Sequence, residues 1–127
     1  MPQTTYDSIK GRKLGIDALT GALWMKAKSG LTALAGGGQT GATDIPAALT
    51  RFTTVATAAD SALLPPAKAG KIHAICNAAA ANSMTVYPAS GEAINALSAD
   101  AGFAVAANKT ALFICFVDGK WNTILTA

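Results

Sequence analysis

The stretch ALFICFVDGKWNTILT, residues 111–126, decides the fold class of this chain. Residues 111–117 are apolar at odd and even positions alike, which is typical of a central strand that is buried on both faces. Residues 120–126 follow as a second strand. Asp118 and Gly119 stand between the two runs, and both residue types accept the positive φ of a tight primed turn. The stretch therefore predicts a β-hairpin.

Further strand signals precede this hairpin, because short alternating or β-branched runs recur along the chain. They lie at residues 51–57, 71–77, 84–87 and 103–107. Six or seven short strands with a turn every 8 to 12 residues or so predict an all-β fold, in the form of a jelly-roll-like or sandwich domain. Alanine is the best helix former, so a short helix at 56–62 stays open as an alternative within this fold.

Glycine-rich residues divide the chain into parts. Residues 29–43 contain three consecutive glycines, 36–38, which give the backbone more freedom than a packed element tolerates. We therefore predict an extended N-terminal arm at 1–28, a joint at 29–43, and the β-sandwich or jelly-roll domain at 44–127. The apolar residues of the arm fit a helical and a strand pattern equally, so its conformation stays open.

The net charge is confined to the arm. Residues 1–28 hold five basic and two acidic residues and so carry the whole net charge of +3, while residues 29–127 balance. Basic residues this sparse, without interleaved aromatics, do not form the dense stripe of phosphate contacts that nucleic-acid binding needs. We expect instead an arm that docks on a complementary protein surface and orders on binding.

The remaining composition is apolar but poor in large side chains. Hydrophobic residues make up 51% of the 127 residues, yet 29 residues are alanine and only 6% are aromatic. The core must therefore come from a short set of larger side chains. The longest run of large apolar residues, 111–117, is far shorter than the roughly 20 residues that span a bilayer. Only 17 charged side chains cover the surface, which indicates burial against other chains.

Residues with catalytic or metal-binding chemistry are scarce. The chain has one histidine, one glutamate and two cysteines, whereas common zinc sites need three or four such ligands. We expect a structural role for His73 within its strand and a core or sheet-face position for Trp121. Cys76 and Cys115 are too few for a disulfide framework and are predicted to be free, buried thiols. We therefore expect no catalytic, metal-binding or cofactor-binding residues and no enzyme activity.

Several short motifs run through the second half of the chain. They are Leu64-Pro65, Ala-x-x-Gly-Lys at 67–71, the strand-ending Asn77, SMTVYPASGEAIN at 83–95, and an apolar strand with x-Gly-x-Trp at 113–121. Within them, Lys71 and Glu92 are candidates for an ion pair at the rim. Together the motifs resemble a module that recurs in virion proteins of tailed bacteriophages, in capsid decoration (cement) proteins and in head or tail fibres. The match covers about half of the chain and includes no catalytic signature.

The resemblance implies a virion structural protein on the capsid surface, made in the host cytoplasm. The first expectation is a decoration protein that binds the major capsid protein through its arm, stabilises the head and assembles as a homotrimer, without nucleic acid or membrane. The alternative is a head- or tail-fibre module for host or glycan recognition, although the predicted turns hold few aromatic or acidic side chains. The candidate capsid contacts are Tyr6, Ile9, Lys10, Arg12, Lys13, Leu14, Ile16, Leu19, Leu23, Trp24 and Met25.

Overall fold

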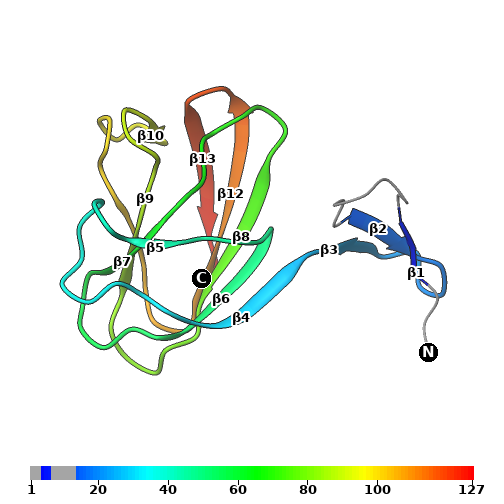
Figure 1. Ribbon diagram of the computed structural model, residues 1–127, viewed down its shortest axis with the longest axis horizontal. Helices are drawn as coiled ribbons and strands as arrows, with labels where there is room; N and C mark the ends of the chain where they lie inside the picture. The colour runs from blue at the N-terminus through cyan, green and yellow to red at the C-terminus, as the bar shows by residue number, and fades with distance from the viewer. Residues whose placement is uncertain (1–3, 7–13) are drawn as a thin grey trace.

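The structure is a computed structural model that describes residues 4–6 and 14–127 (Figure 1). Every element of secondary structure within these residues is a β-strand, so the prediction of an all-β fold is confirmed. Figure 1 shows a small sheet near the N-terminus and a larger body of two facing sheets. The strand β4, Ala27–Thr32, connects the two parts.

The small sheet is antiparallel, in the order β1-β2-β3. The bounds of its strands are Thr4–Tyr6, Leu14–Asp17 and Leu23–Met25. It extends away from the body in Figure 1. The sequence leaves the conformation of the arm open between helix and strand, and every element in its described part is a strand.

The larger sheet of the body has six strands in the order β10-β13-β12-β8-β6-β4. Their bounds are β4 Ala27–Thr32, β6 Leu49–Thr54, β8 Ile72–Asn77, β10 Ala93–Ile94, β12 Lys109–Val117 and β13 Lys120–Leu125. The facing sheet has four strands in the order β11-β9-β7-β5. Their bounds are β5 Thr43–Asp44, β7 Asp60–Leu63, β9 Met84–Tyr87 and β11 Phe103–Val105.

The chain winds between the two sheets like a β-solenoid. From β4 to β9 successive strands alternate between the sheets, and neighbours within each sheet are parallel: β4 with β6, β6 with β8, β5 with β7, and β7 with β9. The antiparallel strands β11, β12 and β13 and the short strand β10, which is parallel to β13, then complete the sheets. The jelly-roll prediction is therefore wrong in its connectivity, since a jelly roll is built from antiparallel Greek keys. The prediction failed because a turn that carries the chain from one sheet to the other contains the same residue types, at the same spacing, as a hairpin turn within one sheet.

The hairpin that decided the fold class is present. β12 and β13 are antiparallel, and Gly119 takes a φ of 85° in the turn between them. β12 lies between β13 and β8, so its central position is confirmed. Burial on both faces is wrong, however: Phe113 is fully buried on one face, whereas Phe116 on the other is 68% exposed. The outward face of this strand has no second layer in the chain itself.

The segment 56–62 is not helical. Ala59 has a φ of 72°, which no α-helix accommodates, and β7 begins at Asp60. Asp60 and Ser61 both hold the glycine-rich segment: the Asp60 carboxylate accepts a bond from the Gly36 amide (3.1 Å), and the Ser61 hydroxyl donates to the Gly38 carbonyl (2.7 Å).

The glycine-rich residues 29–43 are thus part of the body, and not the free joint that their composition predicts. Their first residues belong to β4, which pairs with β6 along the edge of the larger sheet. At Gly37 a Cβ atom would lie 2.5 Å from the Ala59 carbonyl oxygen, so only glycine allows this close approach. The chain leaves the body near Lys26, ahead of the predicted joint.

The core lies between the two sheets and matches the short set of large side chains that the composition predicts. Its largest fully buried members are Trp121, Phe52, Phe113, Leu64, Ile75 and Met84. Alanines such as Ala62 and Ala111, both fully buried, fill the narrow spaces between them. Because alanine allows the sheets to approach closely, few large residues suffice to close this core.

Candidate interaction surfaces

The hairpin of β2 and β3 is a preformed element. The Asp17 carboxylate accepts hydrogen bonds from the amides of Leu19 (2.8 Å) and Thr20 (3.3 Å). The Asp17 amide donates to the Ala22 carbonyl (2.9 Å), and Gly21 takes a φ of 73°. An aspartate that bonds the following backbone amides is a standard way to fix a turn. The tip of the hairpin is therefore fixed in shape before any partner binds.

This hairpin exposes apolar side chains. Leu19 at the tip is 79% exposed, and Ile16 and Leu23, which face each other across the strands, are 55% and 62% exposed. Trp24 lies opposite Gly15 and is 39% exposed, and Met25 is half-buried. Lys26 and Lys28 follow and are exposed. The hairpin thus combines a fixed apolar surface with positive charge.

The other predicted contacts lie wholly or partly outside the described residues. Ile9, Lys10, Arg12 and Lys13 fall in the undescribed segment, and for Tyr6 and Leu14 only the backbone in β1 and β2 is described. The structure therefore brings together five of the eleven candidates on one hairpin: Ile16, Leu19, Leu23, Trp24 and Met25. Their role as capsid contacts stays a prediction.

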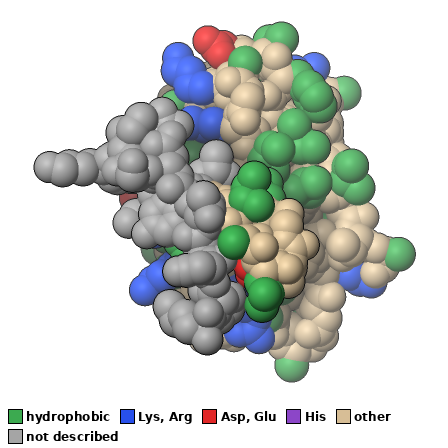
Figure 2. Space-filling model, turned by 90° about the vertical axis from the view of Figure 1, so that its right-hand side faces the viewer, with side chains coloured by type: hydrophobic (Ala, Val, Ile, Leu, Met, Phe, Trp, Pro, Cys, Tyr) green, Lys and Arg blue, Asp and Glu red, His purple; other side chains and the backbone are tan. Residues whose placement is uncertain are grey.

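A second set of apolar side chains lies on the outward face of the larger sheet, beside a row that contains Arg51, Cys76 and Thr110. By strand alternation, one row contains Leu49, Ala74, Leu112 and Ile124, which are paired across β6, β8, β12 and β13. The next row pairs Ile72 with Ile114, and Phe116 continues the same face of β12. We call this surface the outer band, defined by Leu49, Ile72, Leu112, Ile114, Phe116 and Ile124. Figure 2 looks onto this side, with the arm in front of the sheet, and shows hydrophobic side chains interspersed with other side chains.

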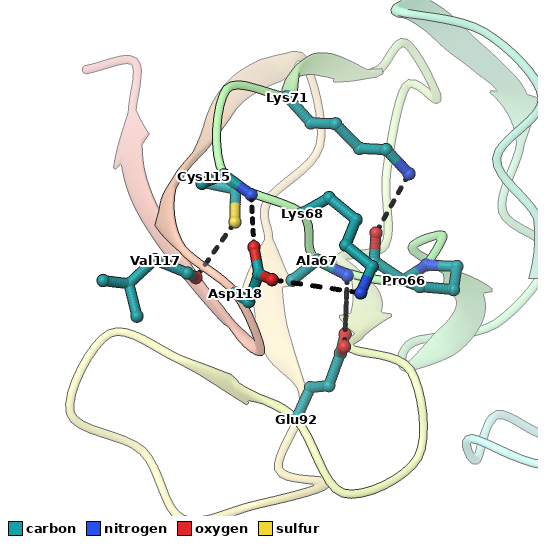
Figure 3. Close-up of polar contacts among 9 residues, drawn as sticks. Pro66, Ala67, Lys68, Lys71, Glu92, Cys115, Val117 and Asp118 are labelled. Carbon is teal, nitrogen blue, oxygen red and sulfur yellow. Dashed lines mark hydrogen bonds and ion pairs between the residues drawn. The ribbon is translucent and has the colours of Figure 1, made fainter.

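Parts of three of the motifs that carry the phage resemblance, from residues 67–71, 83–95 and 113–121, meet at one corner of the body (Figure 3). The Glu92 carboxylate accepts the Ala67 amide through both oxygens (2.9 and 3.1 Å). The Asp118 carboxylate accepts the Ala69 amide (2.9 Å), and its other oxygen lies 3.9 Å from Lys68 Nζ at an exposed position. Backbone bonds join Gly70 to Cys115 and Gly119 to Ala67. The corner therefore fixes the crossing from β7 to β8 against the β12–β13 turn.

The predicted pairing of Lys71 with Glu92 is replaced by two other contacts. Lys71 Nζ donates to the Pro66 carbonyl (3.0 Å), and Glu92 is engaged by the Ala67 amide (Figure 3). These bonds satisfy backbone groups next to a proline pair that forms no regular strand. The corner is a structural contact between loops, because Glu92 and Asp118 both accept hydrogen bonds from backbone amides.

Removal of the Glu92 carboxylate should destabilise the body. Ala67 is only 1% exposed, so Glu92→Ala leaves its amide buried without an acceptor. A buried donor without an acceptor costs about 1–3 kcal/mol. We therefore expect the free energy of unfolding, measured by urea denaturation, to fall by that amount. Glu92→Gln keeps one acceptor oxygen and should lose less. Equal losses for the two variants would show that a neutral acceptor of the same length does not replace the carboxylate, so the charge and not the acceptor oxygen would matter here.

His73 contacts structural partners within the body. A ring nitrogen of His73, Nδ1, lies 2.9 Å from the Ala47 carbonyl, and the ring packs edge-on against Trp121 at 5.6 Å between centroids. Burial lowers the pKa of His73, with Lys71 adding to the effect, so the ring is neutral at pH 7. A neutral ring held by a core tryptophan fits the predicted structural role.

The two cysteines are free thiols, as predicted. Cys115 is buried and donates to the Val117 carbonyl (3.1 Å, Figure 3), whereas Cys76 is only half-buried. Cys76 pairs with Thr110 on the neighbouring strand, five positions along β12 from Cys115. The expectation of two buried thiols is therefore correct for one of them.

Comparison with known proteins gives no family: no family model matches the chain, and no curated protein matches it at a significant level. In the described part of the chain, no group of three or more His, Cys, Asp or Glu residues is placed to hold a metal ion. Among the same residues, no helix is long and apolar enough to cross a membrane.

Proposed function

We propose that this chain is a structural assembly protein of a phage particle, a decoration protein that attaches to the major capsid protein through the β2–β3 hairpin. The observation that carries the proposal is the hairpin itself, a fixed turn that presents Leu19, Ile16 and Leu23 to solvent. Exposed leucines on a preformed turn are what a docking element requires, because little conformational entropy is lost on binding.

Charge supports the same assignment. The segment 1–28 carries the net charge of +3, whereas residues 29–127 are balanced. An acidic capsid surface would attract the positively charged arm, and the body, which has no net charge, would then lie above the arm. The motif corner adds a stable scaffold for this arrangement, since its carboxylates bind backbone amides.

The proposal is tested with full-length variants and capsid shells that lack this chain. Leu19→Asp places a charge at the tip of the hairpin, and burial of one leucine contributes about 1.5–3 kcal/mol, so binding should weaken at least about tenfold. Leu97→Asp is the matched control, because Leu97 is a leucine of the body that is 42% exposed. Binding is measured by co-sedimentation with the shells over a range of protein concentrations.

Each result has a definite meaning. Weakening by Leu19→Asp with normal binding of Leu97→Asp supports the hairpin as the contact. Unchanged binding of Leu19→Asp would place the contact elsewhere on the chain. Binding to host-cell glycans without binding to shells would overturn decoration and favour the fibre alternative.

A further inference from the structure

We propose that His73 is an acid-sensitive switch in the body: protonation moves its ring from its place beside Trp121 into solvent and loosens the contact between β8 and the loop 45–48. The proposal does not depend on the hairpin or on attachment to a capsid. It begins from the composition, because His73 is the only histidine of the chain. Histidine is the side chain whose ordinary pKa places its charge change in mild acid, so one residue accounts for a response there.

The neutral ring of His73 has a defined orientation. Nδ1 lies 2.9 Å from the Ala47 carbonyl oxygen, which can only accept a hydrogen bond, so Nδ1 carries the proton. The ring packs edge-on against the fully buried Trp121, with 5.6 Å between the ring centroids. His73 itself is half-buried. Because the ring already borders solvent, it can reach water without any unfolding of β8.

The bond to Ala47 also holds the loop 45–48 between β5 and β6. The Ala47 carbonyl accepts a second bond from the Thr50 hydroxyl (2.9 Å), and the Ala48 carbonyl accepts the Ala74 amide (2.7 Å). His73 and Ala74 therefore bind adjacent carbonyls of the loop, one through its side chain and the other through its backbone. If the ring of His73 leaves, the loop loses the side-chain attachment and the Trp121 ring loses its cover on that side.

The strands around His73 carry only basic side chains. The charged residues of β6, β8, β12 and β13, together with the residue just before β8, are Arg51, Lys71, Lys109 and Lys120. Arg51 pairs with Cys76 on the outward face, and Lys120 is exposed. Lys109 lies four residues before Phe113, which pairs with His73. A second positive charge on the inward face therefore meets no opposite charge from these strands.

Acidic side chains of the neighbouring turns do not compensate the charge either. Glu92 and Asp118 accept hydrogen bonds from backbone amides at the motif corner. Asp44, three residues before Ala47, is exposed on β5 of the facing sheet. Among the described residues, no carboxylate contributes to the pKa of His73. A protonated ring is thus more stable in water than in its place beside Trp121.

The direction of the pH dependence follows from these surroundings. Burial lowers the pKa of His73 below its ordinary value of 6.5, the Ala47 bond acts in the opposite direction, and Lys71 lowers it further. As pH falls through 6.5 the unfolded chain binds the proton first, so the folded state loses stability from there down to the folded pKa. Asp60 and Asp100, whose pKa values lie below 3.8, do not titrate in this range.

The test uses Trp121 as a fluorescent reporter in the full-length chain. Trp24→Phe removes the other of the two tryptophans, and emission, circular dichroism and urea unfolding are measured from about pH 8 to about pH 5. We expect a one-proton transition below pH 6.5 in which emission shifts to longer wavelength, because water reaches the indole. The urea midpoint should fall over the same range, while circular dichroism without urea stays constant.

His73→Gln in the same background is the matched control. Glutamine is uncharged at every pH and can donate to the Ala47 carbonyl, so its emission and urea midpoint should not change over this range. Proton NMR of the natural chain is the second measurement if this variant does not fold, since a single histidine needs no assignment by mutation.

Three results would each overturn the proposal. The first is a folded-state pKa of His73 at or above 6.5 in the NMR titration. The second is Trp121 emission, or a urea midpoint, that stays constant between about pH 7.5 and about pH 5. The third is the same acid-dependent change in His73→Gln as in the chain that retains His73.

Discussion

Replacement of Trp121 by alanine is expected to lower the free energy of unfolding by about 3–5 kcal/mol, the cost of deleting a large aromatic side chain from a packed core. Trp121 is fully buried on β13 between the two sheets, and its ring contacts His73 edge-on. Domains of this size are stable by about 5–15 kcal/mol, so the variant should be close to unfolded at 37 °C. Urea unfolding followed by circular dichroism measures the loss.

Two further variants separate volume from hydrogen bonding. The Trp121 indole nitrogen has no hydrogen-bond partner among the described residues, so Trp121→Phe removes an unsatisfied buried donor together with part of the volume. We expect Trp121→Phe to cost far less than Trp121→Ala. Trp24→Ala, on the arm, should change the unfolding of the body by less than about 1 kcal/mol. A loss below 1 kcal/mol for Trp121→Ala would contradict its place in the core.

The strands that local sequence could predict are those with a strong alternating or apolar pattern. The signals at 51–57, 71–77, 84–87 and 111–117 correspond to β6, β8, β9 and β12 within a few residues. β7 was missed because its sequence, DSAL, is small and polar, and β5 and β10 because each has only two residues. Pairing partners supplied by the rest of the fold define these short strands.

The connectivity could not be predicted for a different reason. A turn between strands of one sheet and a corner between two sheets use the same residues, and only long-range pairing distinguishes them. The parallel register of β6 with β8, for example Thr50 with Ile75, has no local signature. Antiparallel hairpins such as β12–β13 do have a local signature in their turn residues, and Asp118-Gly119 predicts this hairpin for that reason.

The interaction surfaces were predicted in part. The arm was selected from charge and unpartnered apolar residues, and the exposure of Leu19 and Leu23 agrees with that choice. The turn at Asp17 was missed, although an aspartate four residues before Gly21 is a recognisable turn signal. The outer band had a signal as well, the apolar character of both faces at 111–117. That character predicts burial on both faces, whereas the structure covers only one of them, because an apolar pattern does not specify how many layers a chain supplies.

Asp60 gave no sequence signal at all, and its replacement by asparagine is expected to destabilise the body strongly at neutral pH and progressively less in acid. The carboxylate is buried at the start of β7 and accepts bonds from the Thr57 hydroxyl (2.7 Å), the Thr57 amide (3.0 Å) and the Gly36 amide (3.1 Å). In Asp60→Asn one oxygen becomes an NH₂ group, which must face a backbone amide donor. If the NH₂ group replaces Oδ1, the bond from the Gly36 amide is lost, and if it replaces Oδ2, the bond from the Thr57 amide is lost, so either orientation weakens the turn that holds the glycine-rich segment.

The pH dependence follows from the sign of the shift. The Thr57 hydroxyl bond, above all, lowers the pKa of Asp60 below its ordinary value of 3.8, and the amide bonds from Thr57 and Gly36 act in the same direction. A carboxylate with a depressed pKa in the folded state contributes stability above the unfolded value near 3.8, and that stability is lost as pH falls through the folded pKa. The difference in unfolding free energy between the natural chain and Asp60→Asn should therefore be constant from pH 7 to about pH 5 and shrink below about pH 4.

Asp100→Asn is the matched control for this titration. The pKa of Asp100 is also lowered, first by the Gln39 side chain and then by the Gly91 amide, but the residue is exposed and asparagine tolerates its φ of 66°. Because water can replace those bonds, Asp100→Asn should destabilise much less than Asp60→Asn at pH 7. If the two variants unfold alike in urea at pH 7, Asp60 does not anchor the glycine-rich segment. If the Asp60→Asn difference persists unchanged at pH 3, its origin is steric, because the carboxyl of the unfolded chain is by then largely protonated and a contribution from the charged acceptor must shrink.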